Sequence, residues 1–288
     1  MRVTVRVPAT SANLGPGFDC LGMALDLCNE VTVDTEAEPG VTWEGEGADE
    51  LPRDGSDVVS RAMREAASEV GTALPPLFML GRNRIPLERG LGSSAAAAVA
   101  GAAAAMAIGG LPEADEPYRA FDVAARLEGH PDNAAAATFG GITFVVDAIP
   151  RRVEPHPDLR PVLLVPEDVR TATPESRRAL PDPVSRRDAV AQVSYVAALV
   201  VALTDDPRLL PLAMRDRLHE DARLDRLPQI RAVREGLRGA GVPVCLSGAG
   251  PSLLAFEVDG AAVPDPGEGW RVLRTGIRRT GLEIRVEG

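Results

Sequence analysis

The segment Pro86-Leu-Glu-Arg-Gly-Leu-Gly-Ser-Ser-Ala95, followed by an alanine-rich run to Ile108, is a glycine–serine loop that opens a predicted helix. Gly90 and Gly92 carry no side chains, so successive backbone N–H groups can approach an anion closely. The start of a helix adds unpaired N–H donors and the positive end of the helix dipole. The two serines add hydroxyls that can bind a phosphate or a magnesium ion. The pattern predicts a nucleotide phosphate site; the alternative is a glycine turn before an alanine-rich core helix.

Two large classes of nucleotide site are excluded by residues that the chain lacks. It contains no lysine, because all 31 basic residues are arginine. A P-loop needs a lysine that reaches the outer phosphates. The dinucleotide-binding fingerprint also fails, since Ala95 stands where its third glycine belongs. P-loop kinases and nicotinamide-dependent enzymes are therefore both excluded.

The composition is that of an ordinary globular protein. The 288 residues carry a formal net charge of −11, which argues against a general nucleic-acid binder, because such proteins usually show a basic face. Three cysteines without a C-x-x-C spacing indicate free thiols in a reducing cytoplasm. Residues 1–7 alternate like a strand and do not resemble a signal peptide. The apolar run 94–108 is too short to span a bilayer, so no membrane contact is expected.

The first half of the chain mixes predicted strands and helices. Val3, Val5 and Val7 alternate with polar residues and predict a first strand, which a loop follows from Pro8 to Asp19. Further strands are predicted at 21–35, 41–44, 77–80 and 142–146. Helices are predicted from residue 58, capped by Ser56 and Asp57, and at 95–108, 118–128 and 133–138.

The second half begins after a cluster of prolines. Four of them between residues 150 and 161 predict a boundary between two domains, 1–150 and 151–288. Strands are predicted at 162–165, 242–246, 253–258, 271–273 and 282–286, and helices at 184–204, 207–219 and around 230–237. Both halves mix the two kinds of element, so the predicted fold class is α+β.

Phosphoryl transfer requires a phosphate cradle, a divalent cation and a site for the acceptor hydroxyl. The cradle is the loop 90–95. Glu128, at the end of a predicted helix, is a candidate Mg²⁺ ligand together with Ser94, because Mg²⁺ prefers a few hard oxygen ligands. The alternative for Glu128 is a solvated carboxylate at a helix end. Zinc chemistry and a serine nucleophile lack the necessary spacings.

Polar residues in loops are candidates for the acceptor site. Asn13 and Asp19 lie in a glycine-containing loop, and turn chemistry is the alternative for both. Asp132 is a candidate general base, with helix capping as the equal alternative. Arg177 and Arg223 are candidates for binding a carboxylate, although one arginine among so many carries little signal alone.

Three motifs taken together resemble a known family. They are Pro8-Ala-Thr-Ser-Ala-Asn-Leu-Gly-Pro-Gly-Phe-Asp19, Gly90-Leu-Gly-Ser-Ser-Ala95 and Ser247-Gly-Ala-Gly-Pro-Ser252. Their order resembles that in the superfamily of galactose, homoserine, mevalonate and phosphomevalonate kinases, and the first motif is most similar to that of homoserine kinases. The resemblance implies an N-terminal ATP-binding domain with a left-handed βαβ unit and a C-terminal ferredoxin-like domain. It also implies ATP-dependent, Mg²⁺-dependent phosphorylation of the side-chain hydroxyl of L-homoserine, a step of threonine biosynthesis.

The resemblance also implies roles for individual residues. Asn13, Glu128, Asp132 and Asn133 would be catalytic, and Ser94 and Glu128 would hold the metal. Asn13, Asp19, His130, Arg177 and Arg223 would bind homoserine, with Asp19 on its ammonium and the arginines on its carboxylate. The ATP site would comprise Pro86, Leu87, Glu88, Arg89, Gly90, Leu91, Gly92, Ser93, Ser94 and Ala95, with Asp57 near the adenine.

Some positions depart from the family's pattern. Asp57 stands where the family often has Asn, and an acidic side chain there can only accept hydrogen bonds. For the acceptor proton, Asp132 as a base and direct attack with electrostatic stabilisation are equal alternatives. A sister kinase of the superfamily and a non-catalytic paralogue that binds nucleotide or amino acid are two competing hypotheses for the whole chain. A homodimer is a further expectation.

Overall fold

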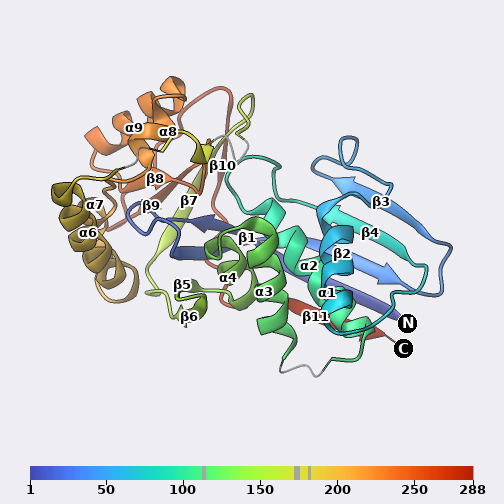
Figure 1. Ribbon diagram of the computed structural model, residues 1–288. Helices are drawn as coiled ribbons and strands as arrows, with labels where there is room; N and C mark the ends of the chain where they lie inside the picture. Colours follow the sequence, from blue (N-terminus) through green and yellow to red (C-terminus); the bar gives the residue numbers. More distant parts are fainter. Residues whose placement is uncertain (112–114, 172–175, 181–182, 288) are drawn as a thin grey trace.

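The computed structural model describes residues 1–111, 115–171, 176–180 and 183–287. Its first layer is a sheet in the order β11-β1-β2-β4-β3, with β5 and β6 attached beside β2 (Figure 1). The strands are β1 (Arg2–Ala12), β2 (Leu21–Asp34), β3 (Gly40–Gly45), β4 (Phe78–Asn83), β5 (Ile142–Val146), β6 (Ile149–Val153) and β11 (Glu283–Glu287). The predicted alternation in β1 is confirmed, because Val3, Val5 and Val7 are all fully buried.

The first strand is longer than the sequence predicts. It continues through Pro8 to Ala12, so the glycine-containing loop starts only at Asn13. Pro8 does not end the strand, because the register with β2 shifts between Pro8 and Ala9 and a proline is tolerated at such an irregularity. As a result, Thr10 and Ser11 lie on a rigid strand beneath the site.

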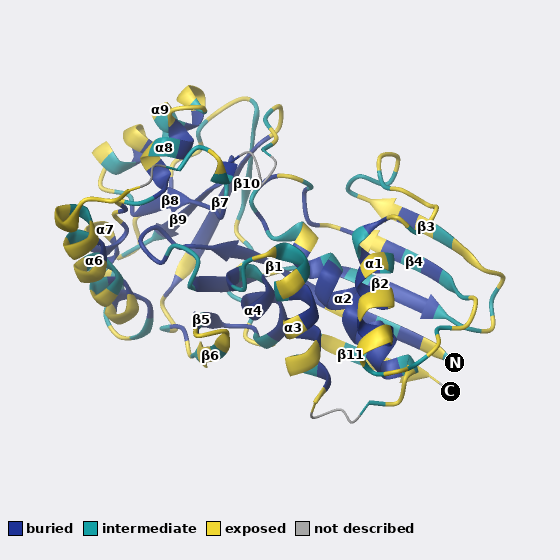
Figure 2. Ribbon diagram, in the orientation of Figure 1, coloured by how far each residue is buried: buried dark blue, intermediate teal, exposed yellow. Residues whose placement is uncertain are grey.

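Four helices cover one face of this sheet (Figure 1). They are α1 (Val58–Glu69), α2 (Ser93–Ile108), α3 (Glu116–Glu128) and α4 (Asp132–Phe139). The predicted cap of α1 is confirmed, since the Asp57 carboxylate accepts the Ser60 N–H at 2.9 Å. Helix α2 lies at the centre, and nearly all its residues from Ala95 to Ala107 are buried (Figure 2). A Cβ on Gly101 would lie 2.2 Å from the Val59 carbonyl oxygen, so the two helix backbones approach very closely.

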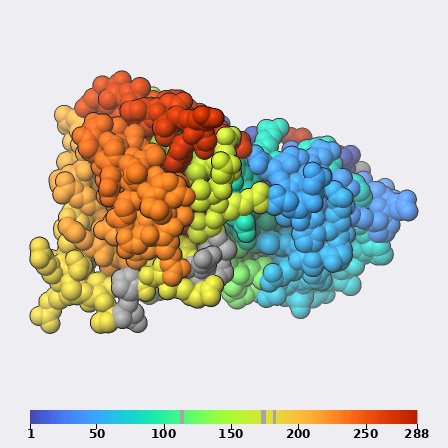
Figure 3. All heavy atoms as spheres, turned by 90° about the horizontal axis from the view of Figure 1, so that it is seen from above, coloured from blue at the N-terminus to red at the C-terminus, as the bar shows by residue number. Residues whose placement is uncertain are grey.

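A second, antiparallel sheet has the order β10-β7-β9-β8. It comprises β7 (Arg160–Pro166), β8 (Val244–Leu246), β9 (Leu253–Glu257) and β10 (Trp270–Leu273). The helical segments of this part are α6 (Arg186–Thr204), the 3-10 turn η1 (Pro207–Leu209), α7 (Leu210–Ala213), α8 (Glu220–Leu224) and α9 (Pro228–Gly239). Seen from above, the blue N-terminal residues and the orange residues of the later helices occupy opposite ends of the molecule (Figure 3).

Strand pairing crosses the predicted domain boundary twice. β6 spans residue 150 and pairs with β5, and β11 returns from the C-terminus to pair with β1. The division into 1–150 and 151–288 stays a prediction, but the first sheet itself takes strands from both ranges.

The predicted helix at 207–219 is wrong in its second half. Helix α7 ends at Ala213, and the next helix starts at Glu220. The reason is Asp216, whose Oδ2 accepts the N–H groups of Leu218, His219 and Glu220 at 2.7–3.0 Å. A side-chain acceptor for three successive N–H groups stabilises a turn in place of a continuous helix.

Helix α6 is, by length and composition alone, the one helix among the described residues that could cross a membrane. Its Gln192, Leu199, Ala202 and Leu203 are buried against the rest of the protein. Its outer side is apolar and exposed, and carries Val190, Val193, Val200 and Val201 (Figure 2). The predicted absence of a span at 94–108 agrees with the burial of α2 in the core.

Candidate functional site

A cavity of about 490 Å³ is lined by residues from both halves of the chain. It is lined by the end of β1, the start of α2, the α3–α4 junction and residues of the second half of the chain. Most of the site residues expected from the sequence line it: Asn13, Asp19, Pro86, Glu88, Arg89, Gly90, Leu91, Gly92, Ser93, Ser94, Glu128, His130, Asp132, Asn133, Arg177 and Arg223. The fold therefore brings together residues as distant in the chain as Asn13 and Arg223.

The first turn of α2 faces this cavity with free backbone donors. Gly92 precedes the helix in a left-handed conformation, with φ of 67°, and no described side chain caps the helix. A Cβ on Gly92 would lie 1.9 Å from the Thr10 hydroxyl oxygen, so only glycine fits there. The first N–H groups of an uncapped helix, together with its dipole, form a site for an anion.

The glycine loop is held in place by the loop between β8 and β9. Ser247 Oγ donates to the Gly90 carbonyl at 2.8 Å. A Cβ on Gly90 would lie 2.2 Å from the Ser247 carbonyl oxygen and 2.8 Å from that of Gly250. Arg89 ties the glycine loop to a different element, the end of β7, because its Nε donates to the Pro166 carbonyl at 2.9 Å. The positions of Gly90, Ser247 and Gly250 show that the glycine loop and the β8–β9 loop are in direct backbone contact.

Ser94 and Glu128 lie together at the mouth of the loop. Ser94 Oγ donates to Glu128 Oε1 at 2.6 Å. A hydroxyl and a carboxylate oxygen next to an anion site are a fitting pair of ligands for a cation such as Mg²⁺, which keeps waters and phosphate oxygens as its other ligands. The described residues contain no group of three or more His, Cys, Asp or Glu that could hold a metal alone.

The α3–α4 junction places three polar side chains beside the cavity. His130 Nδ1 lies 3.2 Å from Asp132 Oδ1, and this hydrogen bond raises the pKa of the His130 imidazole. Asp132 is buried, and its Oδ1 also accepts the Asn133 N–H at 2.7 Å. Asp132 is the first residue of α4 rather than its N-cap, which is Pro131. Asn133 Oδ1 accepts the Thr10 hydroxyl proton at 2.7 Å.

The loop after β1 presents an acidic side chain that already has a partner. Asn13 and Asp19 both adopt left-handed conformations, with φ of 68° and 56°. Asn13 Oδ1 accepts the Asp19 N–H at 3.0 Å, and Asn13 Nδ2 donates to the Gly248 carbonyl at 2.9 Å. Arg177 donates to both carboxylate oxygens of Asp19, at 2.9 and 2.6 Å. Asp19, which is expected to bind the ammonium of the substrate, thus pairs with Arg177, which is expected to bind the substrate's carboxylate.

Arg223 is a buried cation without a carboxylate partner in the described part of the chain. It is 4% exposed, and none of the ion pairs among described residues includes it. Its Nη1 donates to the Gly248 carbonyl at 2.9 Å, whereas its Nε is buried without a partner in that part. Burial, and then the nearby Arg177, lower the pKa of the Arg223 guanidinium. The centre of the Phe18 ring lies 5.4 Å from the guanidinium carbon of Arg223 and 5.7 Å from that of Arg177.

Three expected residues are not among the described residues that line the cavity. Asp57 caps α1, and both of its carboxylate oxygens bind Ser60. The Leu87 side chain lies beside the backbone of Gly47. Ala95 is buried inside the first turn of α2.

Residues that the sequence interpretation did not single out support the site from below. Thr10 holds Asn133, and His219 and Asp216 lie behind Arg223. Nothing in the sequence around Thr10, beyond its position in a strand, indicates a role in the site. The position of His219 could have indicated one, because it stands four residues before Arg223, a spacing that brings two side chains onto the same helix face.

Comparison with known proteins gives the family. The model for the GHMP kinases N terminal domain matches residues 57–141. The chain is 41% identical to homoserine kinase of Corynebacterium jeikeium, covering 100% of this chain and 97% of that protein. It is 43% identical to homoserine kinase of Streptomyces coelicolor, covering 98% and 94%. The chain belongs to the homoserine kinase family.

Solved structures agree with this membership. The crystal structure of homoserine kinase from Cytophaga hutchinsonii matches with a TM-score of 0.84 and 27% identity, covering 99% of this chain and 97% of that one. A mevalonate kinase structure matches with a TM-score of 0.67 at 12% identity, which supports the fold alone. The chain therefore has the mixed α+β fold of these kinases and is a phosphotransferase, as the resemblance implied.

Gly90→Ala tests the contact between the two loops. A Cβ at this position would collide with two backbone carbonyls, so we expect the loops to separate and the KM for ATP to rise about tenfold, equivalent to about 1.4 kcal/mol of binding. Steady-state kinetics with varied ATP concentration measure this KM. Gly71→Ala is the control, because Gly71 has a similar φ of 69° but no atom within 4 Å. An ATP KM equal to that of the control would contradict the expectation.

Proposed function

We propose that this protein transfers the γ-phosphoryl group of ATP to the side-chain hydroxyl of L-homoserine, giving O-phospho-L-homoserine for threonine biosynthesis. The observation that carries the proposal is one cavity that is lined both by the N-terminus of α2 and by Arg177 and Arg223. The N-terminus of α2 forms one anion site, and Arg177 and Arg223 form the other. Near-full-length identity of 41–43% to homoserine kinases supports the same substrates.

The ATP end of the cavity is built from backbone groups. The uncapped N–H groups at the start of α2 would hold the phosphates, and the loop 86–92 would enclose them. Because a phosphoryl transfer enzyme mainly positions its reactants and stabilises charge, a rigid set of donors is the chief requirement. The Asp57 carboxylate, which binds Ser60 at the start of α1, would also accept a hydrogen bond from the adenine.

We assign the magnesium ion to Ser94 and Glu128. Their oxygens, 2.6 Å apart, suit Mg²⁺ as two of its ligands. When bound, the ion would neutralise charge on the phosphate oxygens. The protein's own contribution is to hold Glu128 at the C-terminus of α3 and Ser94 in the first turn of α2, so that both oxygens face the phosphates.

The acceptor end fits an amino acid that carries an ammonium and a carboxylate. Asp19 would bind the ammonium, and Arg177 and Arg223 would bind the carboxylate. On binding, Asp19 and Arg177 would exchange each other for the substrate's ammonium and carboxylate, so each of these two charges has a partner both with and without the substrate. Asn13 and His130 complete the substrate site at its edges.

Asp132 and Asn133 form the proposed catalytic end of α4. Asp132 Oδ1 is occupied by the Asn133 N–H and His130, so Oδ2 is the atom left for the acceptor hydroxyl. In direct attack no side chain takes the hydroxyl proton, which passes to an oxygen of the transferred phosphoryl group, while the N-terminus of α2 and the cation would stabilise the developing charge. Both routes need the acceptor oxygen held in line with the phosphoryl group.

The finer architecture is also a proposal. The parallel strands β3 and β4 with α1 in their connection support the βαβ unit, whose left hand the resemblance implies. Numbered along the chain, the second sheet has the order 4-1-3-2, which supports a ferredoxin-like domain. We also propose that the enzyme is cytoplasmic and contacts neither membrane nor nucleic acid. The three unpaired cysteines support a reducing compartment, and the burial of the apolar helix α2 in the core leaves that helix unable to contact a membrane.

We further propose a homodimer through α6. No charged residue interrupts this helix between Asp188 and Asp205, and its outer valines are exposed. In an antiparallel pair related by a two-fold axis, Arg187 of one copy would face Asp205 of the other. Light scattering tests the proposal, and a monomeric mass at micromolar concentration would reject it.

A coupled assay of ADP release tests the activity itself. We expect turnover with ATP, Mg²⁺ and L-homoserine. We expect a much lower kcat/KM with the amino alcohol that lacks homoserine's carboxylate, because a buried cation left without its partner costs about 2–5 kcal/mol. Mevalonate and galactose are the controls. Turnover of either in place of homoserine would move the assignment to a sister kinase.

Glu128→Gln tests the metal assignment. The amide keeps the shape of the side chain but removes its charge, so we expect a lower kcat and a Mg²⁺ concentration for half-maximal activity that is about tenfold higher. Titration of activity with Mg²⁺ at saturating ATP measures both. Asp122→Asn, exposed on the same helix, is the matched control. An unchanged Mg²⁺ requirement in Glu128→Gln would remove this residue from the metal site.

A further inference from the structure

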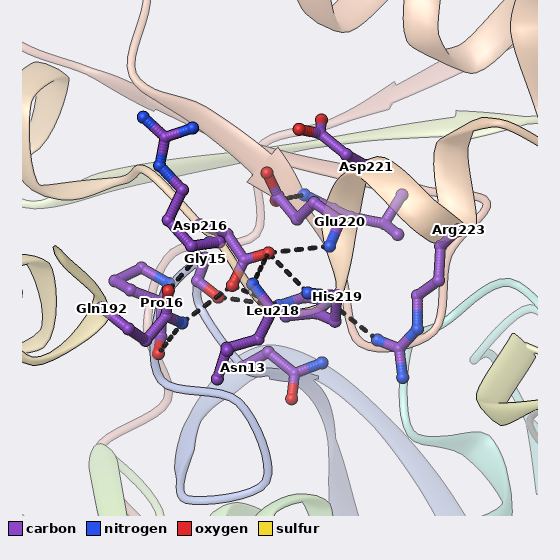
Figure 4. Close-up of polar contacts among 12 residues, drawn as sticks. Asn13, Gly15, Pro16, Gln192, Asp216, Leu218, His219, Glu220, Asp221 and Arg223 are labelled. Atoms are coloured by element: carbon purple, nitrogen blue, oxygen red, sulfur yellow. Dashed lines mark hydrogen bonds and ion pairs between the residues drawn. The ribbon is translucent and has the colours of Figure 1, made fainter. Parts of the chain in front are cut away.

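The imidazole of His219 lies between two groups whose hydrogen-bonding roles are fixed. Its Nε2 lies 2.8 Å from the Gly15 carbonyl oxygen, which can only accept. Its Nδ1 lies 3.0 Å from Arg223 Nη1, which can only donate. Figure 4 shows the ring between the loop after β1 and the guanidinium of Arg223.

These two contacts fix the form of the ring. Nε2 must carry the proton that it donates to Gly15, and Nδ1 must carry the lone pair that accepts from Arg223. A ring protonated on both nitrogens would place an N–H against the guanidinium, and a ring protonated only on Nδ1 would lose both bonds. The geometry therefore demands a neutral His219 in one tautomer.

The position of the ring is itself held by a buried network. Asp216 accepts the His219 N–H at 2.7 Å, and Gln192 Nε2 donates to Asp216 Oδ1 at 2.8 Å and to the Pro16 carbonyl at 2.7 Å. The ring also stacks on Phe18, with 5.0 Å between centroids. Phe18 lies on the loop that carries Asp19, and Gln192 and the His219 ring are hydrogen-bonded to that loop through the Pro16 and Gly15 carbonyls, whereas Asp216 reaches it through these two residues. The network thus links the orientation of Arg223 to the loop that holds the other end of the acceptor.

We propose that His219 is a positioning residue that aims the Arg223 guanidinium at the carboxylate of the acceptor. Within the described part of the chain, the guanidinium donates to the Gly248 carbonyl and to this ring, and both bonds use the same Nη1. Holding one nitrogen from behind leaves the remaining edge of the guanidinium for a carboxylate, which binds arginine through two parallel hydrogen bonds. The inference rests on the proposed function, because it requires a substrate with a carboxylate.

Two substitutions separate the two bonds of the ring. In His219→Asn the side-chain oxygen can replace Nδ1, so Arg223 keeps its acceptor. In His219→Gln the amide nitrogen can replace Nε2, so the bond to Gly15 is kept and Arg223 loses its acceptor. We expect His219→Gln to raise the KM for homoserine about tenfold or more, with the KM for ATP unchanged. We expect His219→Asn to raise the KM for homoserine about threefold or less.

The analogue without a carboxylate provides the decisive comparison. The KM for this analogue should be the same in the wild type and in His219→Gln, because Arg223 has no anion to bind. If the analogue turns over too slowly, its inhibition constant is compared instead. His156→Gln is the control, since His156 lies partly exposed beside a different cavity. A purely structural role for His219 would weaken homoserine and its analogue equally, and that result would overturn the proposal.

Nuclear magnetic resonance of the wild type tests the geometry without any variant. The chain has only three histidines, so their ring nitrogens can be assigned. We expect His219 to show a slowly exchanging Nε2–H and an unprotonated Nδ1 at neutral pH. A ring protonated on Nδ1 would overturn the proposal even if homoserine is not the substrate. Absence of homoserine turnover by the wild type would reject the proposed function while leaving this measurement valid.

Discussion

The site depends on the direct contact between two backbones, that of Gly90 and that of the loop Ser247–Ser252. Because a Cβ on Gly90 would overlap two carbonyl oxygens, no side chain separates the two loops. The contact fixes the glycine loop, and the loop leads directly into α2. Since nearly all of α2 is buried, its N-terminus cannot tilt away without disturbing the core. A rigid anion site can thus be built from neutral backbone groups, without the lysine on which P-loops rely.

Electrostatic balance governs the part of the cavity that Arg177 and Arg223 line. Two arginines converge there in a chain whose net charge is −11, and both lie against the Phe18 ring. Burying a cation is costly unless it is paired or hydrogen-bonded. Asp19 meets this requirement for Arg177, whereas Arg223 relies on a carbonyl and a neutral histidine. A substrate carboxylate would stabilise both arginines at once, and this is the reason for proposing that the cavity binds an amino acid rather than a sugar.

Local patterns predicted most elements of the fold. The alternation of valines gave β1, the loop 90–95 gave the start of α2, and Gly129 gave the end of α3. The errors occurred where a distant partner overrides a local preference. Pro8 lies within β1 because its neighbours pair with β2. The chain turns at Asp216 because its carboxylate accepts three nearby N–H groups, and Gln192 from another helix holds that carboxylate in place. The pairing of β11 with β1 leaves no local signal at all, since it joins the two ends of the chain.

The sequence by itself determined the chemistry available to this protein: a glycine loop before a helix, no lysine, and separate polar motifs that resemble those of one kinase superfamily. These features depend on residue types and short spacings, and both can be read locally. Only the tertiary structure decided which groups meet. It paired Asp19 with Arg177, placed His219 behind Arg223, and set the Ser247–Ser252 loop against Gly90. Such contacts join positions far apart along the chain, so the packing of the two sheets, and not any local preference, determines them.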